Sequence, residues 1–369
     1  MFKKLRDKNL ETWLKGYLDH KRRKLFTPKP KKKHLLFAVC DHYEPLWGKP
    51  NHSQGLSRVQ AWTERYESAF SQYKDAYGHS PKHTYFFPGE EYHASYLDGL
   101  SRLCSKNLGE VELHIHHDDE TADNLRIEIQ KFLKLFSKHG HISKSAQGLY
   151  QYAFIHGNWA LANGRKDGRW CGVDDELQVL FDTGCYADFT FPSAPDECQP
   201  NFVNCHYWPT GDLLKKRPYD QGQVAKVGCF FDDRLLMITG PLELARRGKG
   251  IRIESSAIDA SDPPTTKRVD RWVESNIHIE NRPEWVFVKV HTHGAPEENA
   301  KTYLGEQGQQ MHHYLSTRYN DGDQWKLHYV SAREMYNIAA AAMHGESGDP
   351  EQFRNYRIRP PDIVESQNH

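Results

Sequence analysis

The stretch GEVELHIHHDDE, residues 109–120, passes from an alternating apolar pattern to a run of histidines and aspartates. The alternation over 110–116 predicts a β-strand, because successive side chains of a strand point to opposite faces. His114 and His116 then share one face and can reach one ion together, with Asp118 one step further along. Imidazoles and carboxylates are together the ligands of a divalent metal. The stretch therefore predicts a strand that ends at a metal site.

Strand and helix patterns alternate on both sides of this stretch. Further strands are predicted over 34–40, 83–88, 151–156, 187–191 and 284–291, and helices over 57–78, 93–106, 119–140 and 331–345. The last helix opens with a capping box from Ser331 to Glu334. Repeated alternation predicts an α/β fold with a parallel sheet, open or closed into a barrel. The interval 196–265 is rich in Pro, Asp and Gly, and we interpret it as an excursion that covers the barrel.

The chain is expected to hold one barrel-like domain over 34–330, preceded by an arm and followed by a helix and tail over 331–369. The arm, residues 1–33, carries 13 Lys and Arg against three acidic residues. Leu10, Trp13, Leu14, Tyr17 and Leu18 recur in it at helical spacing. The arm is interpreted either as a solvated, frayed tail or as a helix that docks on an acidic membrane surface.

Composition excludes several classes of protein. The apolar runs are too short to cross a bilayer, and the basic N-terminal stretch lacks the continuous apolar core of a signal peptide. Seven cysteines without a CxxC pair argue against a disulfide framework. No further basic cluster is interleaved with aromatics, which argues against nucleic acid. We therefore expect a cytoplasmic protein, with peripheral contact to the inner face of the membrane if the arm docks there.

Four polar clusters follow predicted strands. They are CDHYEP (40–45), HIHHDD (114–119), IHGNW (155–159) and HTHG (291–294). In parallel sheets and barrels, ligands and catalytic groups lie at the carboxyl ends of the strands. The convergence of four such clusters on one edge predicts an active site there.

Each cluster suggests a role. Asp41 ends the first strand and is expected to bind the ion together with His114 and His116, which leaves an open position for water. His291 and His293 form a second HxH pair, which could ligate metal or donate a proton to a leaving group. Trp159 is expected near the rim, where an aromatic face with a polar edge suits a sugar ring.

The order of these motifs resembles the polysaccharide deacetylase superfamily, of the NodB-homology or carbohydrate esterase 4 type. Its members have a distorted (β/α) barrel, commonly of seven strands. FAVCDH (37–42) stands where the family has Thr-Phe-Asp-Asp-Gly, with Asp41 on the metal-binding Asp. HTYFFPGEE (83–91) matches a strand that ends in Phe before Gly. GEVELH (109–114) matches the segment up to the first histidine of the family's His-x-x-x-His metal motif, and WVFVKVH (285–291) matches the strand that carries a general-acid histidine, here His291.

The chain departs from the family pattern at three positions. Cys40 replaces the catalytic base, so Glu44, with His42 as the lesser candidate, is expected to take that role. Asp118 falls on the second metal histidine, so either His116 or Asp118 must complete the site. His156 replaces the Arg of a family loop and is expected, with Trp159 and His293, to contact substrate.

The resemblance covers about residues 34–295 and implies a metal-dependent hydrolase, with Zn²⁺ as the ion, that removes an N- or O-acetyl group from a saccharide. Exopolysaccharide biosynthesis is the expected setting. Two alternatives remain open. One is another metal hydrolase, of the amidohydrolase or phosphoesterase kind, which also uses HxH pairs. The other is an inactive glycan-binding barrel that lost its base, for which Cys40 is the best support.

Overall fold

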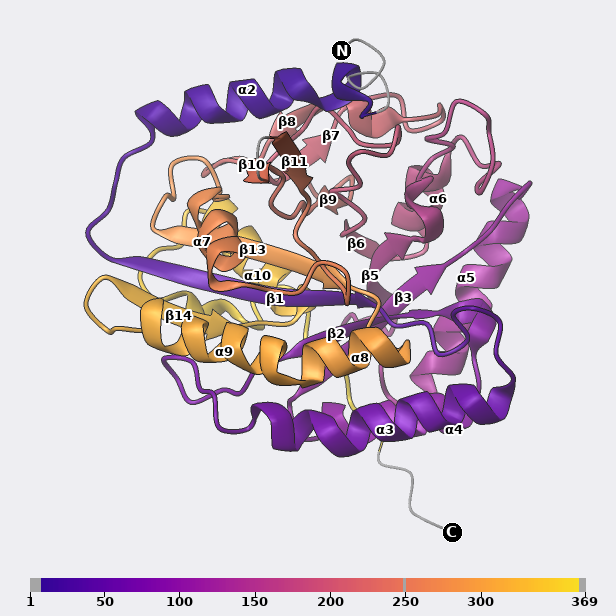
Figure 1. The fold of residues 1–369 in the computed structure, drawn as a ribbon. Coiled ribbons are helices and arrows are strands. Elements are labelled where there is room, and N and C mark those ends of the chain that lie inside the picture. The colour runs from indigo at the N-terminus through magenta and orange to yellow at the C-terminus, as the bar shows by residue number, and fades with distance from the viewer. Residues whose placement is uncertain (1–7, 248–249, 365–369) are drawn as a thin grey trace.

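A computed structural model describes residues 8–247 and 250–364, and it has a mixed α/β fold built on one large, mostly parallel sheet (Figure 1). The 12 strands of this sheet lie in the order β12-β13-β1-β2-β3-β5-β6-β9-β7-β8, with β14 beside β1 and β4 beside β5. They span Lys33–His42 (β1), His83–Pro88 (β2), Gly109–Ile115 (β3), Ser143–Lys144 (β4), Tyr150–His156 (β5), Cys185–Asp188 (β6), Tyr207–Pro209 (β7), Gly222–Val224 (β8), Leu236–Met237 (β9), Ala257–Ile258 (β12), Trp285–Thr292 (β13) and Trp325–Tyr329 (β14). A separate antiparallel hairpin joins β10 (Glu243–Arg247) to β11 (Gly250–Glu254).

The described residues do not pair into a closed barrel of named strands, although isolated bridges link Lys226, after β8, to Glu280 and Ile277 to Phe287 of β13. Strands from β12 to β9 pair in parallel, but no pairing joins β12 at one edge to β8 at the other. The predicted closed, seven-stranded barrel is therefore not confirmed. The interval 196–265 explains the difference, because its strands β7 and β8 join β9 in antiparallel pairing and extend the sheet.

Helices cover both faces of the sheet. One face carries α3 (His52–Phe70), α4 (Ala94–Cys104), α5 (Ala122–Ser137), α6 (Glu176–Asp182), α7 (Thr266–Glu274), α8 (Glu297–Leu304) and α9 (Glu306–Arg318). The other face packs on α10 (Ala332–Met343), all of whose residues are buried. Helix α3 begins five residues earlier than predicted, because Asn51 caps it by accepting the N–H of Gln54 at 2.9 Å.

Side chains of β1 alternate between these two apolar cores. Leu35, Phe37 and Val39 pack with the helices α3 to α9, whereas Leu36 and Cys40 pack with α10. The alternation follows from the pleat of a strand. The position of a polar residue in this alternation therefore determines on which face of the sheet its side chain lies.

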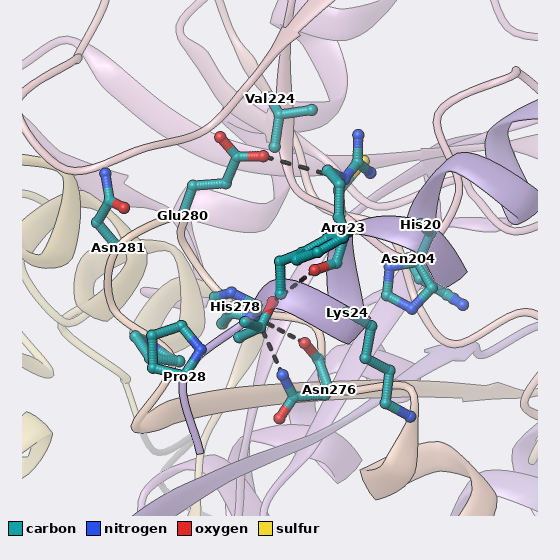
Figure 2. A pocket seen from close by; sticks show the side chains of 14 residues that line it. His20, Arg23, Lys24, Pro28, Asn204, Val224, Asn276, His278, Glu280 and Asn281 are labelled. Atoms are coloured by element: carbon teal, nitrogen blue, oxygen red, sulfur yellow. Dashed lines mark hydrogen bonds and ion pairs between the residues drawn. The ribbon is translucent and has the colours of Figure 1, made fainter. Parts of the chain in front are cut away.

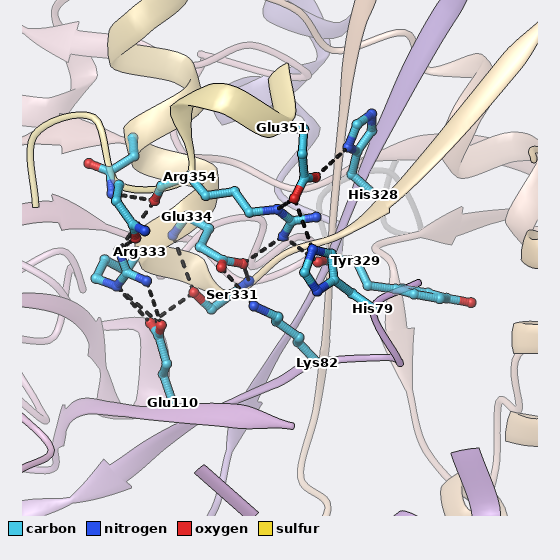
Figure 3. Close-up of polar contacts among 12 residues, drawn as sticks. His79, Lys82, Glu110, His328, Tyr329, Ser331, Arg333, Glu334, Glu351 and Arg354 are labelled. Atoms are coloured by element: carbon cyan, nitrogen blue, oxygen red, sulfur yellow. Dashed lines mark hydrogen bonds and ion pairs between the residues drawn. The ribbon is translucent and has the colours of Figure 1, made fainter. Parts of the chain in front are cut away.

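The start of α10 is fixed by a buried network of charges (Figure 3). The predicted capping box is present, with Ser331 and Glu334 each bonding the backbone N–H of the other. Glu334 also lies between Lys82 Nζ, 2.7 Å from Oε1, and Arg354 Nη1, 2.9 Å from Oε2. Arg333 pairs with Glu110 at 2.7 Å. These bonds join β2, β3 and the residues after α10 at the edge where the strands begin.

Helix α2 (Leu10–Phe26) lies on the protein's own surface rather than fraying from it. Trp13 and Tyr17 are buried against Ala194, Val203 and Leu242, so part of the apolar face that a membrane would need is already used. Residues 1–7 of the arm lie outside the described residues. Among the helices that are described, none is long and apolar enough to span a bilayer.

The second half of α2 borders a hollow of about 450 Å³ (Figure 2). Arg23 and Lys24 of the helix and Glu280 of the segment opposite are among the residues that line it. Arg23 Nε lies 4.0 Å from Glu280 Oε1, a loose pair at the protein surface. The hollow is therefore of mixed charge and marks where the arm meets the domain.

Replacing Glu334 by Gln should lower the free energy of unfolding at pH 7 by about 3–5 kcal/mol, because Lys82 would keep a buried charge without its partner and Arg354 would keep only Glu351 and Asp75. Burial by itself would raise the pKa of Glu334, but the charges of Lys82 and Arg354 lower it below its ordinary 4.5. Such a carboxylate contributes stability above its ordinary pKa and loses it as the pH falls through the folded value.

Urea denaturation from pH 7 down to pH 3 measures this effect. The gap in unfolding free energy between wild type and Glu334→Gln should narrow below about pH 4.5. Glu64→Gln, at an exposed position of α3, is the control and should change little. A difference in unfolding free energy between the two proteins that stays constant at every pH would contradict the ion pairs assigned to Glu334.

Candidate metal centre

His114, near the end of β3, is fully buried and fixed by the neighbouring strand. Its Nδ1 lies 2.8 Å from the carbonyl oxygen of Ile155 on β5. A carbonyl oxygen only accepts hydrogen bonds, so Nδ1 carries the hydrogen and Nε2 of the neutral ring carries a lone pair. Burial lowers the pKa of His114 to about 3, which keeps the ring neutral at pH 7. Nε2 is therefore free to act as a ligand.

Glu44 and His42 come to this imidazole from the end of β1. Glu44 Oε1 lies 3.2 Å from His114 Nε2, and His42, Glu44 and His114 each place a donor atom within 4.8 Å of the others. All three side chains are buried. Burial raises the pKa of Glu44 to about 7 and, helped by neighbouring histidines, lowers the pKa of His42 well below 6.5.

The donor atoms of this group fit a cation. His114 Nε2 and an ionised Glu44 both present lone pairs to one another, which no hydrogen bond can join without an added proton. His42 Nε2 is buried and finds no hydrogen-bond partner within residues 8–247 and 250–364. Two imidazoles and one carboxylate form the protein part of known catalytic zinc sites. The group is compatible with a divalent metal.

His116 borders the group and is held by a carboxylate. Its Nδ1 lies 2.7 Å from Glu90 Oε1, and its backbone N–H donates to the same oxygen at 3.0 Å. Its Nε2 faces Glu44 Oε1 at 3.5 Å. Burial opposes a charge on His116, but the bond to Glu90 and the charge of Glu44 raise its pKa above 6.5. His116, whose side chain is 30% exposed, is thus an oriented imidazole whose charged form is favoured by Glu90 and Glu44.

The histidines of β13 lie beside the same group. The ring of His293 is 4.8 Å from that of His42 between centroids, and the ring of His291 is 6.1 Å away. Both line a cavity of about 510 Å³ together with Trp159. Burial and the charge of Lys289 hold the pKa of His291 well below 6.5. His291 is therefore a neutral imidazole on the cavity wall, and its role as proton donor stays a prediction.

Asp41 does not lie with His114, contrary to the sequence-based prediction. It follows Cys40 by one position and so points to the opposite face of β1. There Asp41 Oδ2 lies 2.7 Å from His83 Nε2, and Oδ1 accepts the N–H of Gly294 at 2.7 Å. The carboxylate that the structure brings to His114 is that of Glu44.

Asp118 and His156 are also placed away from this group. Asp118 is exposed, and its Oδ1 accepts the N–H of Trp170 at 2.6 Å, so it holds a loop. His156 is fully buried and faces Glu176 on the face of the sheet that packs against helices α3 to α9. Neither residue therefore contacts the cavity that His291 and His293 line.

Glu90 was not among the residues predicted for the site. A signal was present, because PGEE (88–91) directly follows the strand over 83–88 and ends at the same edge as the other polar clusters. The structure places Glu90 at the turn after β2, between the ends of β1 and β3, where it orients His116.

Comparisons with known proteins give one distant structural similarity. No protein-family model matches the chain, and no curated protein matches its sequence. A solved structure described as a "putative polysaccharide deacetylase" from Mycobacterium smegmatis is similar over 93% of this chain and 98% of the other. The sequence identity is 10% and the TM-score is 0.38. A similarity this distant carries no argument about activity.

The substitution Asp41→Asn tests whether Asp41 lies on the face of β1 opposite to the group around His114. The change removes a buried charge from the bonds to His83 and Gly294, and it should lower the free energy of unfolding by about 1.5–3 kcal/mol. Metal content, measured on the purified protein by mass spectrometry, should stay at the wild-type level. A variant of wild-type stability that purifies without metal would contradict the placement of Asp41.

Proposed function

We propose that the protein is a metal-dependent hydrolase that removes an acetyl group from a saccharide. The observation that carries the proposal is a buried group of two imidazoles and a carboxylate, His42, His114 and Glu44, whose donor atoms face one another beside an open cavity. Such a group is costly to bury without a cation, because His42 Nε2 has no hydrogen-bond partner among the described residues and an ionised Glu44 offers His114 Nε2 no proton. Polar groups of this kind next to a cavity are the usual mark of an active site.

The proposed ligands are His42, Glu44 and His114, and the ion is a divalent metal of the zinc type. His114 has the support that metal-binding histidines commonly have, an Nδ1–H donated to a backbone carbonyl. Glu44 replaces Asp41 as the expected carboxylate ligand. A bound ion would lower the pKa of a water molecule and polarise the acetyl carbonyl.

His116 takes the proton-transfer role that the sequence suggested for Glu44. Its Nε2 faces the ligand group, Glu90 fixes its ring, and its pKa lies above 6.5. His116 would accept a proton from the attacking water as the new carbon–oxygen bond forms. It would then return that proton to the nitrogen or oxygen of the sugar as the acyl bond breaks. Glu90 holds the imidazole in the tautomer that this transfer requires.

The cavity beside the ligand group suits a sugar. Trp159 lines it, and its Nε1 is buried without a hydrogen-bond partner among the residues that are described. Trp47, half exposed, lies beside His293 with the two rings tilted and their centroids 5.0 Å apart. Aromatic faces with polar edges suit sugar rings. His291, neutral and on the cavity wall, would donate a hydrogen bond to the acetyl oxygen.

His114→Ala and Glu44→Gln should each lose one metal ion per chain relative to the wild type, because each removes one of the three proposed ligands of this site. His116→Gln should keep the metal, since His116 lies outside that group. The matched control is His313→Ala, at an exposed position of α9, which should bind metal as the wild type does. Full metal content in His114→Ala would overturn the ligand assignment.

Acetate release from N- and O-acetylated oligosaccharides, with and without a chelator, tests the activity. His116→Gln should release acetate about 10²–10⁴-fold more slowly at full metal content, the usual contribution of a general base. Hydrolysis of nitrophenyl phosphate, measured in parallel, would favour a phosphoesterase instead. A metal-loaded protein that releases acetate from none of the saccharides would contradict the proposal.

A further inference from the structure

A second cluster of metal-ligating side chains lies on the face of the sheet that packs against helices α3 to α9. It consists of His117 after β3, His156 at the end of β5, Cys171 in the following loop and Glu176 at the start of α6. Each offers one donor atom, and these atoms all lie within 4.8 Å of one another. The side chains of His156 and Glu176 have no exposed surface, and that of His117 is 5% exposed.

Both imidazoles turn Nε2 toward the same carboxylate oxygen. His117 Nε2 lies 3.0 Å and His156 Nε2 3.5 Å from Glu176 Oε1. Their Nδ1 atoms face backbone carbonyl oxygens, that of Cys171 at 3.2 Å and that of Gly157. Carbonyl oxygens only accept, so each Nδ1 carries the hydrogen and each neutral ring has its lone pair on Nε2. The Nε2 lone pairs of both rings then point toward one carboxylate oxygen, Glu176 Oε1.

An extra proton on His117 could pair that ring with Glu176, but His156 would remain unsatisfied. His156 Nε2 is buried and has no hydrogen-bond partner in the described parts of the chain. Burying a polar atom without a partner costs about 1–3 kcal/mol. One cation at the centre of the cluster would satisfy His117, His156 and Glu176 together.

Cys171 makes hydrogen bonds as an acceptor and, as a thiol, as a donor to the carbonyl oxygen of Val173 at 3.5 Å. Its Sγ accepts the backbone N–H groups of Asn163 at 3.2 Å and Val173 at 3.4 Å. It also lies 3.4 Å from Glu176 Oε2, the oxygen that accepts the N–H of Ala162 at 2.6 Å. Hydrogen bonds of this kind around the ligands are typical of metal sites, where they orient the donor atoms.

We propose that His117 Nε2, His156 Nε2, Cys171 Sγ and the Glu176 carboxylate bind one structural Zn²⁺. Four buried nitrogen, sulfur and oxygen donors match the closed, four-coordinate sites that structural zinc prefers. Binding would displace the thiol proton of Cys171, which leaves as H⁺ to solvent, since cysteine binds metal as the thiolate. The site is separate from the candidate metal centre, whose ligand group of His42, Glu44 and His114 contains no thiol.

The ion would fix the loop that forms part of the cavity. Residues 160–175 form neither helix nor strand, and Ala162, Asn163 and Trp170 have positive φ angles. Long segments without secondary structure inside a compact domain need another source of order. The four ligands tie this loop to β3, β5 and α6, directly after Trp159 of the cavity wall. The proposed zinc would therefore hold Trp159 in place.

Cobalt substitution of the full-length protein tests the site. A thiolate bound to Co²⁺ gives an intense charge-transfer absorption in the near ultraviolet, which imidazole and carboxylate ligands do not give. The cobalt protein should show this band, and His114→Ala should keep it. Cys171→Ser should lose the band and one zinc per chain, whereas the control Cys229→Ser, at another unpaired cysteine, should lose neither.

His156→Ala offers a second variant if Cys171→Ser does not fold, and it too should lose one zinc per chain. The cobalt-loaded wild type needs no variant at all. Absence of the thiolate band in that protein would overturn the proposal and leave a hydrogen-bonded cluster. The same conclusion would follow if Cys171→Ser kept both its band and its zinc. Because the band reports Cys171 alone, the result is independent of whether the candidate metal centre is catalytic.

Discussion

Parallel pairing around β1 is the interaction on which the candidate metal centre depends. β1 pairs with β13 from His34 to Asp41, and the second half of β1 pairs with β2, which in turn pairs with β3. Parallel strands end at the same edge of a sheet, so residues far apart in the chain meet there. Glu44, His114 and His293 reach one small volume for this reason. The apolar cores on both faces of the sheet keep that edge rigid.

Burial sets the chemistry of the groups that meet at this edge. Imidazoles lose their charge when water is removed, and the pKa of His114 at about 3 is a direct result. Neutral imidazoles keep a lone pair for a metal, which suits His42 and His114 to the proposed metal binding. His116 differs because Glu90 supports its charge. The same environment thus distinguishes the proposed ligands from the proposed proton-transfer residue.

Local patterns predicted the strands well because alternation and apolar runs are properties of neighbouring residues. β1, β2, β3, β5 and β13 all lie within two residues of their predicted limits. The arrangement of the strands beyond β6 was not predictable in this way, since it depends on pairing between distant segments. Asp41 was wrongly placed for a related reason. Its position in the alternation was known, but the face that holds the histidines depends on how β1 aligns with β3.

The structure brings most of the predicted site residues together at one edge of the sheet and places Asp41, Asp118 and His156 apart from the group around His114. His42, Glu44, His114 and His116 meet as a group, and His291, His293 and Trp159 line the adjoining cavity. His156 was expected to contact substrate, yet it belongs to the cluster with Cys171. An irregular loop brings that cysteine in, and no periodic pattern marks it. Such contacts are visible only once the chain is folded.

X-ray anomalous scattering from crystals of the protein, collected at the zinc absorption edge, tests the central claim most directly. The account predicts a peak at the carboxyl end of β3, within bonding distance of His114 Nε2, the Glu44 carboxylate and the His42 imidazole. A metal-loaded crystal without a peak at this position, or with the ion bound by Asp41 instead of Glu44, would contradict it.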